Sequence, residues 1–186
     1  MGCCDWALTH ELNKVHHDTE WGVPCFDERR LFEFLILEGV QAGLSWLTVL
    51  KKREHYRKVY YDFNPEKIAR FDQRKIESLL KDPGIIRNRL KVESARKNAR
   101  AYLTLRETTS LKDFLWSFVD GQPVINHWKK QSEVPATSAI SDQMSKALKQ
   151  HGFNFVGSTI CYAFMQATGM VNDHLVSCDH RRHTAA

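Results

Sequence analysis

The chain has 186 residues, of which 42% are hydrophobic and 26% are charged, and its formal net charge is +5 at pH 7. These values suit one globular domain spanning residues 1–186 and exclude a disordered or fibrous chain. No apolar run approaches the roughly 18 residues that cross a bilayer, and the first residues lack the segments of a secretory signal. We therefore expect a cytoplasmic protein without membrane contact, with a short disordered tail from about residue 180.

Charge and cysteine content narrow the range of partners. The excess of positive charge is compatible with a polyanion such as nucleic acid but does not identify one. The cysteines are Cys3, Cys4, Cys25, Cys161 and Cys178. In a chain expected to be cytoplasmic, this odd and scattered set favours metal ligands or buried thiols over a disulfide framework.

Apolar residues recur at helical spacing along most of the chain, which predicts an all-α fold. Capping side chains are expected to begin four helices, at Asp27, Asn64, Asp72 and Ser110. The predicted helices cover residues 28–38, 45–61, a segment from 65, 73–81, 88–106, a segment from 110, 138 or 141 to 150, and 158–169. Strand patterns are nearly absent, since Val124-Ile125 is too short to count, and residues 121–137 form the longest predicted loop.

Glu38 shares the apolar face of its predicted helix with Phe34 and Leu31. A carboxylate there either pairs with a nearby base at the edge of the core or points into a cavity. Trp46 follows closely, after the flexible segment 41–45, and is either a core residue or part of the same cleft. A carboxylate and an indole in one cleft suit a cationic or amine-bearing heterocycle.

Two cysteine–histidine pairs lie far apart in the sequence. His174 and Cys178 have the i, i+4 spacing of a zinc half-site, and Cys4 with His17 supplies a second half. The alternative is free thiols and solvated histidines. Other residues that compete as ligands are Cys3, His16, Cys25, His180 and His183.

The segment Asp82-Pro83-Gly84-Ile85-Ile86-Arg87 predicts a tight turn between two helices. Outward backbone N–H groups at such a turn bind a phosphate, as in a helix-hairpin-helix motif, although the second glycine usual in that motif is missing. The next predicted helix carries Arg87, Arg89, Lys91, Arg96, Lys97 and Arg100. This basic run is either a solvated face or a contact to the DNA backbone, and the adjacent turn favours DNA.

These motifs together carry a resemblance. From Cys4 to Cys178 the sequence resembles the bacterial DNA-3-methyladenine glycosylase I family of the helix-hairpin-helix superfamily. The most specific stretches are His17-Asp18-x-Glu20-Trp21-Gly22-Val23-Pro24, Leu37-Glu38-x-x-Gln41-Ala42-Gly43-Leu44-Ser45-Trp46-x-Thr48-Val49-Leu50-Lys51-Lys52-Arg53, Lys146-Ala147-Leu148-Lys149, Gly152-Phe153-x-Phe155-Val156-Gly157 and Asn172-Asp173-His174.

The resemblance implies an all-α bundle and a set of site residues. Cys4, His17, His174 and Cys178 match the family's structural zinc ligands, which join the two ends of the chain. Glu38 matches the carboxylate that recognises the base, and Trp46 and Trp6 match the stacking aromatics. Gly43 and Leu44 belong to the loop that enters the duplex, and Gly84, Arg87 and Arg89 are assigned to the DNA backbone.

The implied activity is removal of 3-methyladenine from alkylated double-stranded DNA. The nucleotide is flipped out, and water then releases the free base. No lysine stands out as a Schiff-base nucleophile, so we expect a monofunctional glycosylase without strand cleavage, acting as a monomer.

The sequence departs from the family at two positions of the base pocket. Asn13 and His16 stand where the family usually has tyrosines. A protonated His16 would repel a cationic base. The alternative function is therefore a non-catalytic or altered-specificity paralogue that binds DNA or a modified nucleobase through the same pocket.

Overall fold

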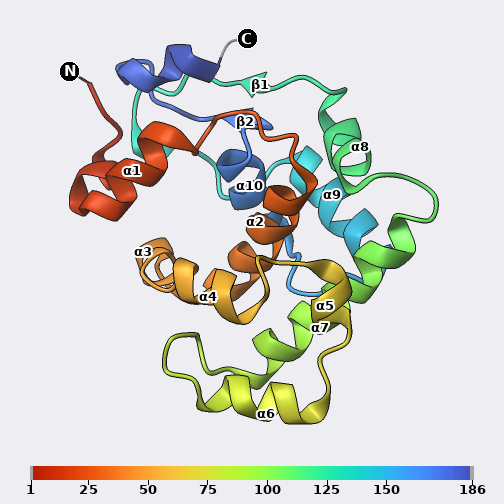
Figure 1. The fold of residues 1–186 in the computed structure, drawn as a ribbon. Coiled ribbons are helices and arrows are strands. Elements are labelled where there is room, and N and C mark those ends of the chain that lie inside the picture. Colours follow the sequence, from red (N-terminus) through yellow and green to blue (C-terminus); the bar gives the residue numbers. More distant parts are fainter. Residues whose placement is uncertain (1, 185–186) are drawn as a thin grey trace.

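The computed structural model describes residues 2–184 and confirms the all-α prediction (Figure 1). The α-helices of this part are α1 (Glu11–Thr19), α2 (Glu28–Gln41), α3 (Trp46–Leu50), α4 (Arg53–Val59), α5 (Pro65–Ala69), α6 (Gln73–Lys81), α7 (Arg89–Leu105), α8 (Leu111–Trp116), α9 (Ala139–Gln150) and α10 (Ser158–Ala167). Shorter elements are the 3-10 helices η1 (Asp5–Thr9), η2 (Ser117–Val119), η3 (Gln131–Glu133) and η4 (Asp179–Thr184), and the strands β1 (Val124–Ile125) and β2 (Val171–Asn172). Within residues 2–184, no helix has the length and apolar character needed to span a membrane.

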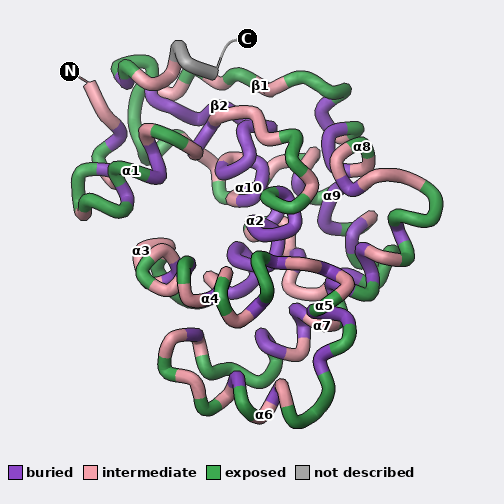
Figure 2. The backbone as a smooth tube through the Cα atoms, viewed as in Figure 1, coloured by how far each residue is buried: buried purple, intermediate pink, exposed green. Residues whose placement is uncertain are grey.

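Helix α2 is the centre of the fold. Every residue from Leu31 to Val40 is buried, so the helix is enclosed on all sides. It contacts α3, α7, α8 and α10, and Figure 2 shows α2 and α10 as largely purple segments in the middle of the molecule. Glu33 and Glu38 are the two carboxyl groups in that buried run, and each requires a partner or a function.

Side-chain caps confirm the predicted helix starts. Asp27, Asn64 and Asp72 each accept a hydrogen bond from the backbone N–H three residues ahead. The hydroxyl of Ser110 does the same for α8, and Ser138 is the cap of α9. These side chains replace the acceptors that the first turn of a helix lacks, which is why the sequence locates the starts well.

The segment 45–61, predicted as one helix, is divided into α3 and α4. The backbone N–H of Lys52 bonds to the carbonyl of Val49, only three residues back, and this tighter turn ends α3. Neither glycine nor proline stands near the break, so the sequence pattern does not reveal it.

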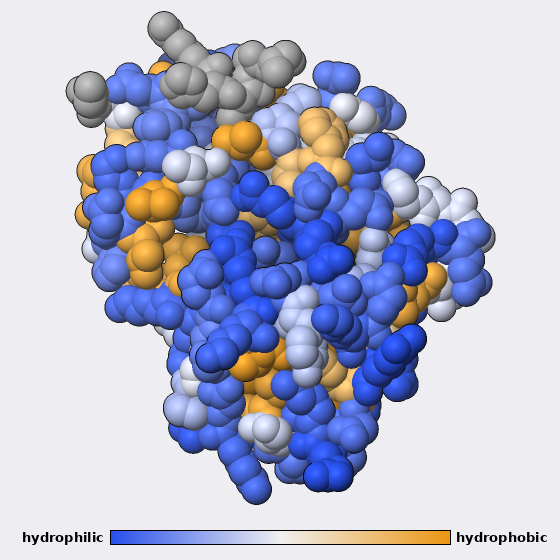
Figure 3. Space-filling view, in the orientation of Figure 1, coloured by the Kyte–Doolittle hydropathy of each residue, from blue (hydrophilic) through white to orange (hydrophobic). Residues whose placement is uncertain are grey.

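Helix α1 has an inverted pattern, which is why the sequence does not predict it. Its buried side chains are polar, namely Asn13, His16 and His17, whereas Leu12 and Val15 are exposed. Figure 3 shows orange side chains gathered at the left, over α1 and α3. Polar groups that turn inward on a helix are typical of a functional site.

The predicted loop 121–137 contains β1 and η3. Val124 pairs with Val171 and Ile125 with Asn172 in a parallel arrangement, so this segment is joined to the chain that follows α10. Such a short strand depends on a distant partner and leaves no pattern of its own in the sequence. Residues 179–184, part of the expected disordered tail, form η4, and residues 185–186 lie outside the described part.

The position of Gly169, soon after α10, requires glycine for two reasons, its backbone conformation and the close approach of another segment. Its φ is +69°, and a Cβ atom there would lie 2.3 Å from the carbonyl carbon of Val23. Gly121 has a similar φ of +72°, but nothing lies within 4 Å of its Cβ position.

We expect Gly121→Ala to lower the free energy of unfolding by about 1–2 kcal/mol and Gly169→Ala to lower it further. Urea unfolding of both variants measures this, and equal losses would contradict the crowding at Gly169.

Candidate active site

A cavity of about 230 Å³ opens between α1, α2, α3 and α10. Its wall combines ring systems with polar side chains, a mixture that suits a flat polar ligand. The lining residues are Trp6, His16, Trp21, Glu38, Gln41, Trp46, Gln131, Ala163 and Gln166. Four of the residues predicted to form the base site, Glu38, Trp46, Trp6 and His16, therefore lie on one cavity.

Glu38 enters the cavity from the enclosed helix α2. The residue is 3% exposed, and its Oε2 has no hydrogen-bond partner within the described chain. Burial raises the pKa of Glu38 to about 8, so the carboxyl group is mostly protonated at neutral pH. A cation in the cavity would favour the ionised form. The site therefore suits a positively charged or amine-bearing ligand.

The aromatic side of the cavity is a chain of ring contacts. The ring centroids of Trp46 and His16 are 5.3 Å apart, those of His16 and Trp6 6.4 Å, and those of Trp6 and Trp21 5.2 Å. The indole Nε1 of Trp46 is buried and has no partner in the described part of the molecule. A buried donor and a buried carboxyl group left open in one cavity indicate a polar ligand that bonds to both.

His16 is neutral near pH 7. Burial lowers its pKa below the ordinary 6.5, although the carboxylate of Glu20 acts in the opposite direction. At neutral pH the ring therefore carries no positive charge that would repel a cationic base. Asn13 is not among the lining residues, since its amide nitrogen donates to Thr9 Oγ1 at 2.8 Å and to the carbonyl oxygen of Trp6.

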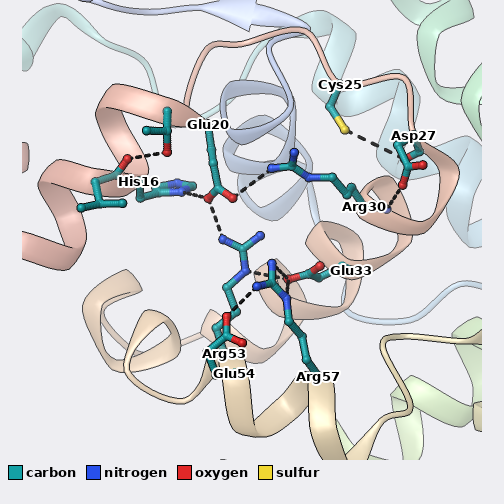
Figure 4. A network of polar contacts seen from close by, with 11 residues as sticks. His16, Glu20, Cys25, Asp27, Arg30, Glu33, Arg53, Glu54 and Arg57 are labelled. Carbon is teal, nitrogen blue, oxygen red and sulfur yellow. Dashed lines mark hydrogen bonds and ion pairs between the residues drawn. The ribbon is translucent and has the colours of Figure 1, made fainter.

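A network of charges lies behind His16 (Figure 4). Glu20, at the end of α1, accepts from His16 Nδ1 at 2.7 Å, from Arg53 at 2.6 Å and from Arg30 at 2.9 Å. Arg53 also bonds to the buried Glu33 at 2.6 Å. The network joins α1, α2 and α4, and it neutralises the second buried carboxyl group of α2.

The loop between α2 and α3 is held by a lysine from α7. The ammonium group of Lys91 donates to the carbonyls of Val40, at 2.8 Å, and Ala42, at 2.6 Å, where the C-terminal end of α2 favours positive charge. Lys91 is therefore buried, which corrects its place in the predicted DNA-binding run. Beyond it, Gly43 has a φ of +76° with open space around it, and Leu44 is exposed.

The turn at residues 82–87 does not present the expected row of outward N–H groups. The N–H of Gly84 bonds to the Asp82 side chain at 2.8 Å, and that of Ile86 to the Tyr56 hydroxyl at 3.0 Å. A Cβ atom at Gly84 would lie 2.3 Å from the ring of His55, so a larger residue would displace that ring from its contact with Asp82. The glycine therefore serves close packing.

Most cations of α7 are also engaged within the protein. Arg100 donates to the carbonyl of Ala69, the last residue of α5, and Arg96 donates to the carbonyl of Phe71, two residues further on. Carbonyls at the end of a helix lack partners within it. Arg89 pairs with Glu77 at 2.8 Å, and Arg87 is exposed. Part of the basic run therefore holds helices together, while Arg87 and Lys97 are exposed and Arg89 is about half exposed.

The four predicted metal ligands meet in the structure. The ligand atoms of Cys4, His17, His174 and Cys178 lie within 4.8 Å of one another, and all four residues are buried. Cys178 Sγ is 3.5 Å from both His17 Nε2 and His174 Nδ1. A tetrahedral zinc ion with bonds of about 2.3 Å to sulfur and about 2.0 Å to nitrogen places these atoms about 3.5 Å apart.

Hydrogen bonds orient both histidines toward this cluster. His17 Nδ1 bonds to Asp18 at 2.7 Å, and His174 Nε2 bonds to the carbonyl of Trp21 at 3.0 Å, so the other ring nitrogens face the cysteines. Burial lowers the pKa of His174 to about 4, which keeps the ring neutral, as a ligand must be. The residues fit a metal ion with a closed set of four ligands.

The competing ligands are not part of this cluster. Cys3 lies 3.9 Å from the Nδ1 of His17 that Asp18 already occupies. His16 bonds to Glu20, and Cys25 approaches the carbonyl of Asp27. His180 is outside the set of four, and the side chain of His183 lies outside the described part.

Comparison with known proteins agrees with this geometry. The model of the methyladenine glycosylase family matches residues 6–182. The chain belongs to this family. It is 51% identical over 179 residues to DNA-3-methyladenine glycosylase 1 of Escherichia coli, a match covering 96% of each chain. It is 47% identical over 176 residues to DNA-3-methyladenine glycosylase of Haemophilus influenzae, covering 94% of this chain and 95% of the relative.

Solved structures of the methyladenine glycosylase family share the fold along its whole length. A crystal structure of 3-methyladenine DNA glycosylase I superposes with a TM-score of 0.94 at 50% identity, covering 96% of this chain and 98% of that one. The Staphylococcus aureus enzyme, in a study of how it recognises 3-methyladenine, superposes with a TM-score of 0.92 at 37% identity, covering 96% and 95%. The resemblance found in the sequence is confirmed.

Sequence reasoning missed five of the nine residues that line the cavity. Trp21, Gln41 and Gln166 lie in motifs or helices that the sequence did mark, but nothing in their spacing assigns them to a cavity. Gln131 comes from η3 in the longest predicted loop, which folds over the site. The pairing of β1 with β2, together with bonds from Asn126 and Trp128 to Asp173, brings that loop near α10.

Glu38→Gln should stabilise the protein more strongly as the pH rises. The unfolded chain releases the proton of Glu38 near pH 4.5, whereas the folded protein retains it up to about pH 8. The free energy of unfolding of the parent therefore falls across that window. The difference between variant and parent should grow by up to about 1.4 kcal/mol per pH unit, as measured by urea unfolding at about pH 5 and about pH 8.

Glu20→Gln is the matched control. Burial raises the pKa of Glu20, but the bonds from His16 and Arg53 dominate and hold it at about 2. Glu20 is ionised in both the folded and the unfolded state above about pH 5, and His16, which it contacts, is neutral in the fold above about pH 7. Its effect on stability should therefore not change between about pH 7 and about pH 8, where the Glu38→Gln difference still grows. A Glu38→Gln difference equally independent of pH would mean that Glu38 is ionised in the fold.

Proposed function

We propose that the protein is a monofunctional DNA base-excision glycosylase that flips an alkylated nucleotide out of duplex DNA and hydrolytically releases 3-methyladenine. The observation that carries this proposal is Glu38, a buried carboxyl group without a partner in a cavity lined by aromatic rings. The relatives in Escherichia coli and Haemophilus influenzae are named for this activity. Free 3-methyladenine is the product, and alkylated double-stranded DNA is the substrate.

The residues of the cavity act on a base that already carries positive charge. That charge weakens the glycosidic bond, so binding the flipped cation is the main task, and water then attacks the sugar carbon. Ionised Glu38 accepts a hydrogen bond from the exocyclic amine and balances the charge, while Trp46 and Trp6 contact the ring. None of the described lysines lines the cavity, which supports hydrolysis without a Schiff base and without strand cleavage.

The loop at Gly43 and Leu44 is proposed to occupy the space that the flipped nucleotide leaves in the duplex. Leu44 is exposed, and Lys91 fixes the start of the loop beside the end of α2. At the turn around Gly84, we propose that Arg87 binds the DNA backbone. Arg89 can do the same if it leaves Glu77 and binds a phosphate instead.

The proposed metal is one structural zinc ion bound by Cys4, His17, His174 and Cys178. Two thiolates and two imidazoles are a set that zinc prefers, and four protein ligands leave no open position for catalysis. The ion would hold η1 and α1, which carry Trp6 and His16, against the segment that follows β2. We also propose that the single domain acts as a monomer in the cytoplasm, where bacterial DNA lies.

The non-catalytic alternative rests on the replaced tyrosines. Its main argument was electrostatic repulsion by His16, which the lowered pKa of that ring removes at neutral pH. Asn13 does not line the cavity. The excising enzyme is therefore the better supported function.

Release of free 3-methyladenine from methylated duplex DNA, followed by chromatography, tests the activity. The parent protein should release the base, and Glu38→Gln should reduce the rate by about tenfold or more, because a hydrogen bond to a charged group is worth about 1.5–3 kcal/mol. Arg87→Gln should weaken binding of methylated and unmethylated duplex alike and leave binding of the free base unchanged.

Glu107→Gln, the same substitution at an exposed position of the chain, is the control and should leave the rate unchanged. A folded parent protein that releases no more base than a protein-free sample would contradict the proposed activity. Loss of base binding in Arg87→Gln would place that residue in the cavity.

The adjacent cysteines provide a matched pair for the zinc site. Elemental analysis should find about one zinc ion per chain in the parent protein and in Cys3→Ser, and little in Cys4→Ser, because only Cys4 belongs to the cluster. Chelation should lower the melting temperature of the parent. Full zinc content in Cys4→Ser, or none in the parent, would refute the assignment.

A further inference from the structure

The proton on the ring of His16 has a defined position. Glu20 is ionised, since its pKa is about 2, so it has no proton to donate to the ring. A buried neutral imidazole carries a single ring proton, on one of its two nitrogens. The contact of 2.7 Å between His16 Nδ1 and Glu20 Oε2 therefore requires that this proton lie on Nδ1.

The other ring nitrogen is left for a ligand. His16 Nε2 has no hydrogen-bond partner among the described residues, and the ring lines the cavity. With the proton on Nδ1, Nε2 presents a lone pair and can only accept a hydrogen bond. A tyrosine hydroxyl, which the family usually places here, both donates and accepts, so the exchange for histidine restricts what this position can bind.

The charge network makes this arrangement rigid. Arg53 binds the same Oε2 of Glu20 at 2.6 Å and is fixed in turn by Glu33, while Arg30 binds Oε1 (Figure 4). Glu20 thus cannot rotate away from His16 without breaking ion pairs in a largely buried region. A buried charge that loses its partner is costly.

Gln166 shows the same arrangement on the other side of the cavity. Its amide nitrogen donates to Asp173 at 2.7 Å, so its carbonyl oxygen is the atom left for a ligand. Asp173 is held by three further donors, from Asn126, Trp128 and Tyr162, each at 2.7 Å. In both His16 and Gln166, the N–H group bonds to a carboxylate of the protein, and an acceptor atom is left for the ligand.

We propose that Glu20 is a positioning residue that holds His16 in the Nδ1–H tautomer, so that His16 accepts a hydrogen bond from an exocyclic amine of the bound base and rejects a carbonyl group at the same position. The inference rests on the proposed function, since it requires a purine base in the cavity. It adds a determinant of specificity beyond the charge balance that Glu38 supplies.

Two free bases that differ at one position test this selectivity. 3-Methyladenine carries an amine where 3-methylhypoxanthine carries a carbonyl oxygen, and quenching of the cavity tryptophans measures both dissociation constants. The parent protein should prefer 3-methyladenine. His16→Phe should reduce this preference by about tenfold, since it removes a hydrogen bond to one base and a lone-pair repulsion to the other.

Glu20→Met should reduce the preference below that of His16→Phe. Without Glu20 the ring is free to place its proton on Nε2, the form that an isolated imidazole favours, and Nε2 then donates to the carbonyl base. A merely structural defect would weaken both bases alike and leave their ratio unchanged. Nitrogen-15 NMR of the imidazole should show Nδ1 protonated in the parent and Nε2 protonated in Glu20→Met. Glu107→Met, the same substitution at an exposed position, should preserve both the ratio and the spectrum.

The outcomes separate this inference from the function on which it rests. A folded parent protein that binds neither base would overturn both. A parent that binds 3-methyladenine, with a ratio unchanged in His16→Phe and in Glu20→Met, would overturn the role of Glu20 and His16 and leave the glycosylase function standing. If Glu20→Met fails to fold, an Nε2–H signal in the parent spectrum overturns the inference, and an Nδ1–H signal together with the reduced ratio of His16→Phe supports it.

Discussion

The desolvation of Glu38 is the constraint around which the cavity is built. Helix α2 is enclosed by other helices over the whole segment from Leu31 to Val40, and no described residue forms a hydrogen bond with the carboxyl group that points out of it into the cavity. A folded protein tolerates such a group only by keeping it protonated, which explains a pKa of about 8. Ionisation of Glu38 is therefore unfavourable in the empty cavity, and a positively charged ligand lowers that cost.

The other charged side chains near the cavity are paired, and Glu38 is the exception among the described residues. Glu33, on the same helix, is neutralised by Arg53 and Arg57, and Glu20 accepts from three donors. The buried ammonium group of Lys91 bonds to carbonyls at the end of α2. A cation that enters the cavity consequently meets one unpaired carboxyl group among charges that are already compensated, and this favours binding in a single orientation.

The sequence predicts well those features that depend on local chemistry. Caps such as Asp27 and Asn64 act within one turn of a helix, and the position of Glu38 follows from helical periodicity. The remaining features depend on tertiary contacts. The basic run of α7 suggests a DNA-binding face, yet Arg96 and Arg100 bond to carbonyls near the end of another helix, and no one-dimensional pattern distinguishes a solvated arginine from one that caps a neighbour.

The cavity wall shows the same limit. Helix α1 buries polar side chains and exposes apolar ones, so periodicity gives no reason to expect a helix there. Gln131 reaches the site because the segment before it pairs with β2 and bonds to Asp173. The family resemblance identifies the ligands of the metal cluster, but the direction of each ring nitrogen depends on backbone and side-chain partners that are known only from the fold.

The contact between Cys4 and His174 brings together residues that are 170 positions apart in the chain. This separation affects the order in which parts of the fold form during translation. The segment that carries Trp6 and His16 leaves the ribosome early, but its anchor is synthesised only after α10. Until then α1 is held at its far end, where Glu20 bonds to Arg30 and Arg53, while η1 at its near end has no anchor in the metal cluster. The cavity wall is therefore complete only after α10, which supplies Ala163 and Gln166, has been synthesised, and the anchor of η1 follows it in the chain.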